Sequence, residues 1–286
     1  MTNSKTATGL PLFMACLGIS GCASNGPVDS SASHDNLDAI AWLQTSAEYA
    51  AVTTGIYNAA SAQLRAIAYA EESQGRGMAV VLDIDETVLD NSRFQAQLVF
   101  DDATYNVDNW DEWVALRAAD AVPGVVDFIR TSQSLGVHVA FVTNRPCQAR
   151  PGVTDECPQW EDTRANLEDV GVDTSSITLM LAAQQPPEQC RALLTEEEQE
   201  SGVWSSDKTS RRECTGLDHD VVMLFGDQFG DFVELEDDAS GKAGRDIAAE
   251  YAEYWGRSWF MLPNPTYGGW KPRSSAEKRS LIRGID

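Results

Sequence analysis

The feature that most constrains the fold of this 286-residue chain is a run of five apolar residues, Met78-Ala79-Val80-Val81-Leu82, which ends at Asp83. A continuous apolar run of this length predicts a strand that is covered on both faces of a parallel sheet. Three similar runs follow along the chain, and a shorter one near the end predicts an edge strand. They span residues 137–142, 177–181, 221–225 and 259–262.

Helical patterns separate these runs. Apolar residues recur at helical intervals over residues 125–134, 160–170 and 208–217, and over 37–72 with a break expected near Thr53-Thr54-Gly55. The alternation of strand and helix predicts an α/β fold with a doubly wound parallel sheet. We expect this domain to span residues 37–286 and to carry a small, mainly helical cap at about 91–121. The segment between the first two motif strands has too few residues to form a large cap domain.

The first 21 residues are predicted to be a targeting segment. Residues 10–20 are apolar but too few to span a bilayer, and Lys5 is the only cation before them. Small residues before Cys22 resemble the lipobox of bacterial lipoproteins, whose cysteine is lipidated. This predicts an outer-membrane lipoprotein, held by its lipid alone, with a flexible tether at 22–36. A plain secretory signal, giving a secreted or periplasmic protein, is the alternative.

The net charge limits the kinds of partner that the chain can bind. A net charge of −23 would repel a nucleic acid backbone, so nucleic acid binding is not expected.

Of the six cysteines, Cys147, Cys157, Cys190 and Cys214 remain after the targeting segment. Pairing of sequence neighbours would staple two loops, although three pairings are open and zinc is the competing explanation. The acidic segment 195–200 is predicted to be a solvated insertion.

Polar residues follow three of the apolar runs at the point where each ends. In open α/β sheets the ligand binds beyond the carboxyl ends of the strands, so these side chains are expected to converge. Carboxylates that close together need a cation, and Mg²⁺ prefers oxygen ligands. An aspartate beside a divalent cation can attack phosphorus, which indicates phosphoryl transfer. The residues are Asp83, Asp85, Thr143, Asn144, Arg145, Asp227 and Asp231.

Together with Lys208, these residues resemble the four motifs of the haloacid dehalogenase superfamily. The motifs are D-x-D-x-T at 83–87, Thr143, a downstream lysine, and G-D-x-x-x-D at 226–231. Within the superfamily, the chain resembles the class C acid phosphatases from about residue 40 to 272. The segments that carry this resemblance are 81–92, 110–113, 122–124, 142–145 and 262–270.

The resemblance implies a role for each motif residue. Asp83 would attack phosphorus to form an aspartyl-phosphate, and Asp85 would protonate the leaving group and then activate water. Mg²⁺ would be held by Asp83, the backbone carbonyl of Asp85 and Asp227, with Asp231 as a ligand or as an orienting group. Thr143 and a cation would bind the phosphoryl oxygens, and the sequence Asp207-Lys208-Thr209-Ser210-Arg211 leaves open whether Lys208 or Arg211 is that cation.

The substrate expectation depends on aromatic residues. Trp110 and Tyr267 are expected to sandwich a nucleobase, with Asn144 and Arg145 also in contact with substrate, whereas Phe94 and Trp113 are expected to pack the cap. The predicted function is a Mg²⁺-dependent acid phosphatase, or 5′-nucleotidase, of the cell envelope that hydrolyses small phosphomonoesters, with nucleoside 5′-monophosphates as the expected substrates. A phosphotransferase variant stays open, as does the oligomeric state. The alternative is a non-catalytic surface lipoprotein that binds nucleotide or haem.

Overall fold

The computed structural model of the chain describes residues 36–71, 76–234, 244–271 and 275–285. The predicted leader with Cys22, and the predicted tether up to residue 35, lie outside the described residues. Among the residues that are described, no helix is both long and apolar enough to cross a membrane.

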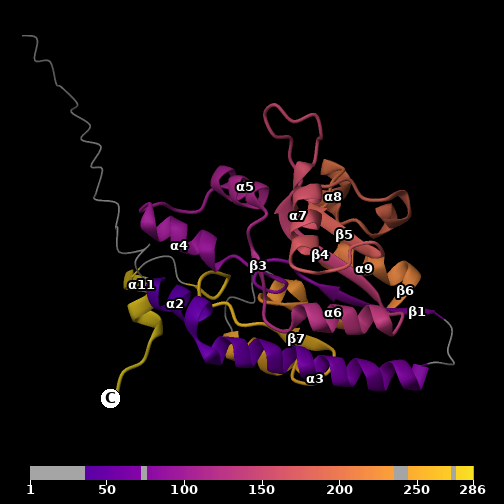
Figure 1. The fold of residues 1–286 in the computed structure, drawn as a ribbon, viewed down its shortest axis with the longest axis horizontal. Coiled ribbons are helices and arrows are strands. Elements are labelled where there is room, and N and C mark those ends of the chain that lie inside the picture. Colours follow the sequence, from indigo (N-terminus) through magenta and orange to yellow (C-terminus); the bar gives the residue numbers. More distant parts are fainter. Residues whose placement is uncertain (1–35, 72–75, 235–243, 272–274, 286) are drawn as a thin grey trace, which may run out of the picture. The chain divides into compact units, whose positions relative to one another are not determined.

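A five-stranded sheet forms the centre of the described chain (Figure 1). Its order is β5-β4-β1-β6-β7, and every neighbouring pair is parallel. The central strand β1 therefore has β4 on one side and β6 on the other, which confirms the predicted parallel sheet. The strands are β1 (Gly77–Leu82), β4 (His138–Pro146), β5 (Ile177–Ala182), β6 (His219–Gly226) and β7 (Trp259–Met261).

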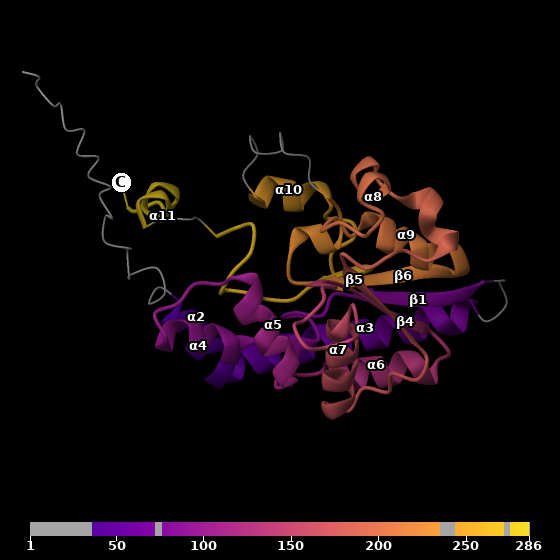
Figure 2. The ribbon, with the colours of Figure 1, turned by 90° about the horizontal axis from the view of Figure 1, so that it is seen from above.

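Helices cover both faces of this sheet (Figure 2). Side chains of β1 alternate between two cores: Val80 and Leu82 pack into the larger one, and Val81 packs on the opposite face with Trp204. The larger core is covered by α3 (Ala47–Glu71), α6 (Val125–Ser134) and α7 (Pro158–Asp169), and the other by η1 (Glu188–Leu193), α8 (Glu196–Ser201) and α9 (Thr209–Asp218).

The first helical stretch breaks earlier than expected. The helix α2 (Leu37–Thr45) ends before Ser46, whose hydroxyl accepts from the Tyr49 backbone N–H at 3.0 Å and so begins α3. The expected break near Thr53-Thr54-Gly55 is wrong, because α3 continues through it. The buried Thr53 hydroxyl donates to the Tyr49 carbonyl at 3.0 Å, within the helix, and so needs no break.

The segment after β1 is mainly helical, and residues 89–121 are called the cap below. It contains β2 (Leu89–Asp90), α4 (Ser92–Phe100), α5 (Val107–Leu116) and β3 (Asp120–Ala121), with β2 and β3 paired antiparallel. Later in the chain come η2 (Phe229–Asp231), α10 (Gly244–Glu250) and α11 (Ser275–Leu281).

Disulfides join the sequence neighbours among the four cysteines. Cys147 pairs with Cys157 between β4 and α7, and Cys190 pairs with Cys214 between η1 and α9. The structure thus selects one of the three pairings that the sequence left open, and the zinc alternative is not needed.

The acidic segment 195–200 is only partly solvated, which corrects the sequence expectation. Glu198 is fully buried, and its carboxylate accepts hydrogen bonds from the Thr195 and Ser205 backbone N–H groups at 3.0 Å and from the Ser210 hydroxyl at 2.5 Å. A carboxylate with this many donors needs no water. The sequence did not show it because two of these donors lie outside the acidic segment.

We expect the Glu198→Gln variant to lose about 2 kcal/mol of unfolding free energy at pH 7, because buried donors lose their acceptor. Burial alone would raise the pKa of Glu198, but the hydrogen bonds from Ser210, Ser205 and Thr195 hold it below its ordinary value. The stabilisation is thus complete above the ordinary pKa and is lost as pH falls through the lower folded-state pKa. Thermal melts from pH 7 to 3 should show the gap between variant and wild type shrinking at the acid end. Glu197→Gln, an exposed neighbour, is the control, and equal melting temperatures for Glu198→Gln and wild type at pH 7 would contradict the prediction.

Candidate active site

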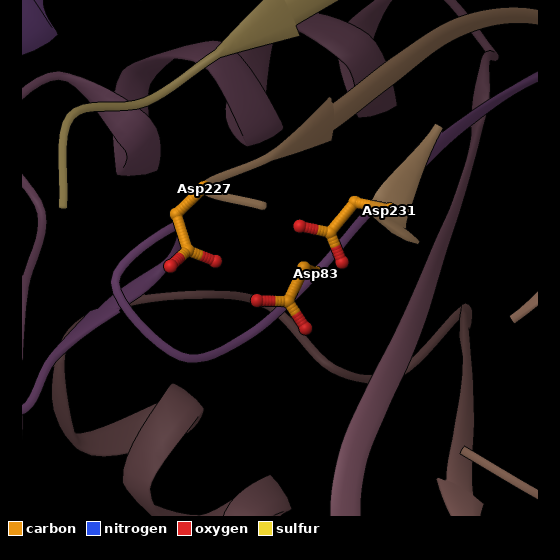
Figure 3. Close-up of side chains that lie close together, drawn as sticks. All are labelled: Asp83, Asp227 and Asp231. Carbon is orange, nitrogen blue, oxygen red and sulfur yellow. The ribbon is translucent and has the colours of Figure 1, made fainter. Parts of the chain in front are cut away.

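Three aspartates converge at the carboxyl ends of β1 and β6. Asp83 directly follows β1, Asp227 directly follows β6, and Asp231 ends η2; their carboxylates point toward one another (Figure 3). One oxygen of each lies within 4.8 Å of the others, and all three side chains are buried. Gly226 makes this approach possible, because a Cβ there would lie 2.2 Å from the Asp231 side chain.

Lys208 is the cation at this cluster. It precedes α9, and its Nζ donates to Asp83 Oδ1 at 2.5 Å and to Asp231 Oδ1 at 2.6 Å. The Arg211 guanidinium lies beneath the site instead, where it donates to the Thr143 carbonyl at 2.6 Å and to the Asn144 side chain at 2.7 Å. Of the two cations that the sequence left open, the structure therefore places Lys208 beside the nucleophile candidate.

The cluster holds more negative charge than its one lysine balances. Burial raises the pKa of Asp83 to about 7, although Lys208 opposes this, and burial with the nearby Asp231 raises the pKa of Asp227 well above its ordinary value. Burial alone would lower the pKa of Lys208, but Asp231 and Asp83 hold it above its ordinary value. Three buried carboxylates are the donor set that a hard divalent cation prefers, so these residues could hold one.

Asp85 lies apart from this cluster and is held by Arg145. The guanidinium donates to Asp85 Oδ1 from Nη2 at 2.7 Å and to Oδ2 from Nε at 3.2 Å. Its Nη1 donates to the Thr163 hydroxyl at 3.1 Å, and its central carbon lies 5.7 Å from the centroid of the Trp110 ring. Arg145, predicted to contact substrate, thus also orients the acid–base candidate and lies against an aromatic ring.

Thr143 and Asn144 lie near the carboxyl end of β4, next to Arg145. The Thr143 hydroxyl is fully buried and donates to Asp85 Oδ2 at 3.4 Å. The Asn144 side chain is exposed and bonded at both ends, to the Ser206 carbonyl at 2.9 Å and to Arg211. The structure therefore brings the polar residues of β1, β4 and β6 to one edge of the sheet, as predicted.

Glu86 and Asn91 were not predicted as site residues. Asn91 is buried and donates to Asp85 Oδ1 at 3.0 Å while it accepts from the Trp113 indole N–H at 2.8 Å. The Glu86 carboxylate accepts from the Asn91 backbone N–H at 3.1 Å and from the Tyr267 hydroxyl. Their position in the segment directly after Asp85 was the available signal.

Asn264 was also missed. Its amide donates to Asp227 Oδ2 at 2.7 Å, and its carbonyl oxygen accepts from the Thr266 backbone N–H at 2.9 Å and the Tyr267 backbone N–H at 3.3 Å. One side chain thereby links the acidic cluster to the loop that carries Tyr267.

A cavity of about 650 Å³ opens over these residues. Trp110 and Tyr267 line it, whereas Phe94 and Trp113 do not, and both of the latter are buried in the cap. Tyr105 also lines the cavity and was not predicted. The sequence-predicted residues on its wall are Asp83, Asp85, Trp110, Asn144, Arg145, Lys208, Asp227, Asp231 and Tyr267.

A parallel α/β sheet whose strand ends gather an acidic cluster, a buried threonine and a lysine defines a phosphoryl-transfer enzyme of the haloacid dehalogenase type. Over residues 27–270 the chain matches the family described as "HAD superfamily, subfamily IIIB (Acid phosphatase)", and it belongs to that family. It is therefore an acid phosphatase, a phosphomonoesterase.

Solved structures of relatives agree with this assignment. The chain is similar to the class C acid phosphatase from Bacillus anthracis, with 28% sequence identity and a TM-score of 0.68, over 89% of this chain and 99% of that one. A structure of the class C acid phosphatase from Bacillus anthracis with tungstate bound gives 29% identity, the same TM-score and the same coverage.

Proposed function

We propose that this acid phosphatase is a Mg²⁺-dependent enzyme of the cell envelope that hydrolyses nucleoside 5′-monophosphates through an aspartyl-phosphate. The observation that carries the proposal is the position of Asp83. It lies beside Lys208 and two further carboxylates, on the wall of a cavity that Tyr105, Trp110 and Tyr267 also line.

In the first step, an Asp83 oxygen forms a bond to phosphorus while the bond from phosphorus to the leaving oxygen breaks. Asp85, protonated at the start, gives its proton to that oxygen.

In the second step, Asp85 takes a proton from a water molecule whose oxygen bonds to phosphorus. The bond between phosphorus and Asp83 breaks, phosphate is released, and both aspartates return to their starting protonation states. The ammonium of Lys208 and the hydroxyl of Thr143 stabilise the charge on the phosphoryl oxygens. Tungstate, bound by a relative, is a tetrahedral oxyanion like phosphate.

Asp83, Asp227 and Asp231 would hold the Mg²⁺, with the Asp85 backbone carbonyl as a further ligand. A bound Mg²⁺ neutralises charge on the phosphoryl oxygens and favours the ionised form of the nucleophile. Asn264 keeps Asp227 oriented for this task through its 2.7 Å hydrogen bond.

We expect the Tyr267→Ala variant to raise the KM for AMP about 10-fold and to leave the KM for a small alkyl phosphate within about twofold. The lost ring contributes about 1–3 kcal/mol of stacking with a base and nothing with an alkyl group. Steady-state kinetics on both substrates measure this difference. Tyr254→Ala, at an exposed tyrosine that does not line the cavity, is the control; equal effects of Tyr267→Ala on the two substrates would rule out the stacking role.

The envelope location draws its support from the sequence and from the cysteines. Small residues precede Cys22 as in a lipobox, and two disulfides are typical of an oxidising compartment. Labelling of cells with a radioactive fatty acid tests whether Cys22 carries a lipid. Incorporation into the wild type and not into Cys22→Ser supports an anchored lipoprotein, and no incorporation supports the secretory alternative.

The experiment that tests the proposed function measures phosphate release from AMP and from p-nitrophenyl phosphate at pH 5.5, with Mg²⁺ or with EDTA. We expect turnover that Mg²⁺ supports and EDTA abolishes, with a preference for AMP. Metal-independent turnover would overturn the Mg²⁺ proposal. No turnover by a folded, Mg²⁺-loaded protein that binds AMP would favour the non-catalytic binding function instead.

A further inference from the structure

The loop between β4 and α7 is closed at both ends. Cys147 and Cys157 form a disulfide across it, and the Cys147 backbone N–H donates to the Ala182 carbonyl at 2.7 Å, which fixes the loop to the end of β5. Both cysteines also pack against the larger core. The loop follows Pro146 at the end of β4, one residue beyond Arg145, so it is anchored beside the active site.

Arg150 projects from this loop onto the cap helix α5. Its guanidinium donates from Nε to Asp111 Oδ2 and from Nη2 to Asp111 Oδ1, both at 2.8 Å, and from Nη1 to Asp162 Oδ2 at 2.9 Å. Gln159 adds a hydrogen bond to Asp111 Oδ1 at 2.7 Å. The Arg150 side chain is 21% exposed and that of Asp111 is 14% exposed, so this bidentate ion pair is largely shielded from water.

Asp111 is the chain neighbour of Trp110, which lines the active-site cavity. Trp110 is 7% exposed, and its ring packs edge-on against Phe94 with the ring centroids 5.1 Å apart. A second arginine also holds α5, because Arg117, directly after the helix, donates to Asp162 Oδ1 from Nε at 2.9 Å and from Nη2 at 2.7 Å. Arg150 differs from it in that its acceptor Asp111 adjoins Trp110 along the chain.

We infer that Arg150 is a positioning residue for substrate selection: from a disulfide-closed loop it holds α5 so that Trp110 presents its ring to a flat aromatic leaving group. Arg150 itself does not line the cavity and touches neither Asp83 nor Asp85. The inference rests on the proposed function, because it requires that Trp110 contacts the leaving group. It names the chemistry that Arg150 controls, namely discrimination between aromatic and alkyl phosphomonoesters.

The test compares kcat and KM of the full chain for AMP and for a small alkyl phosphate. We expect Arg150→Gln to raise the KM for AMP about 10-fold, with kcat and the alkyl phosphate KM within about twofold, because a misplaced ring weakens binding without touching the reacting atoms. Arg150→Lys keeps the charge but loses the bidentate hydrogen bonding, so it should give a KM for AMP between those of wild type and Arg150→Gln. Arg130→Gln, at an exposed arginine on α6, is the matched control.

Two further variants separate positioning from a general loss of stability. In a Trp110→Ala background, the Arg150→Gln change should have no further effect on the KM for AMP, because the ring that it positions is absent. The Cys147→Ser/Cys157→Ser pair should lower discrimination as Arg150→Gln does. Cys190→Ser/Cys214→Ser, which removes the disulfide on the other face of the sheet, should leave discrimination unchanged even if it lowers the melting temperature.

Three results would overturn the inference. An equal effect of Arg150→Gln on both substrates would show a general structural role, and an undiminished effect in the Trp110→Ala background would show that Arg150 does not act through that ring. A wild-type enzyme that turns over both substrates without discrimination would refute the aromatic subsite of the proposed function, and the inference with it. Discrimination by the wild type that persists in Arg150→Gln would refute the inference alone.

Discussion

The Asp83→Asn variant should lose phosphatase activity by roughly 10⁴-fold or more, because the amide that replaces the carboxylate cannot attack phosphorus. The substitution is nearly isosteric, and Lys208 can still donate to the remaining oxygen. Burial raises the pKa of Asp83 to about 7, so its ionised form is disfavoured by folding. The neutral amide removes that cost, and the variant should melt no lower than wild type at pH 8.

Single-turnover and steady-state phosphate release, beside a thermal melt, check this prediction. Asp127→Asn is the matched control, because Asp127 lies exposed on α6 and pairs with Arg130; it should retain wild-type kcat. An Asp83→Asn variant that is folded and keeps more than about a hundredth of wild-type kcat would show that another residue is the nucleophile.

The Lys208→Met variant should lower kcat by about 10²–10³-fold, since it removes the ammonium that lies 2.5 Å from Asp83 and 2.6 Å from Asp231. It should also move the acid limb of the pH–rate profile to higher pH. Lys208 lowers the pKa of Asp83, so its loss raises that pKa further, and the nucleophile then becomes protonated at a higher pH as the solution is acidified.

Profiles of kcat from pH 4.5 to 8 at saturating Mg²⁺ measure both effects. Lys278→Met on α11, outside the residues that line the cavity, is the control for loss of a lysine. A Lys208→Met variant with wild-type kcat would mean that the phosphoryl oxygens are bound without this lysine, and Arg211 would then be the next residue to test.

The sequence predicted the sheet because its signal is local. An apolar run such as that before Asp83 is typical of a strand buried on both faces, and the same holds for the runs that became β4, β5 and β6. The break between α2 and α3 was misplaced because Thr53 looks like a helix breaker in sequence, while in the structure its hydroxyl bonds within the helix.

Several residues that the sequence missed have partners that are distant along the chain. Asn264 contacts Asp227, 37 residues away, and Glu86 contacts Tyr267, 181 residues away. Glu198 shows the same limit, because its burial depends on hydroxyl and backbone donors beyond its own helix. No local pattern reports contacts of this kind.

The sequence by itself determined which chemistry this chain carries, because the types and order of Asp83, Asp85, Thr143 and Asp227 after apolar runs are visible in one dimension. Only the tertiary structure decided how they meet. The strand order places β1 between β4 and β6, so three strand ends adjoin, and α9 then delivers Lys208 rather than Arg211 to Asp83. The physical reason is that charge and hydrogen-bonding capacity belong to a residue, whereas burial and the choice of partner depend on the packing of elements far apart in the chain.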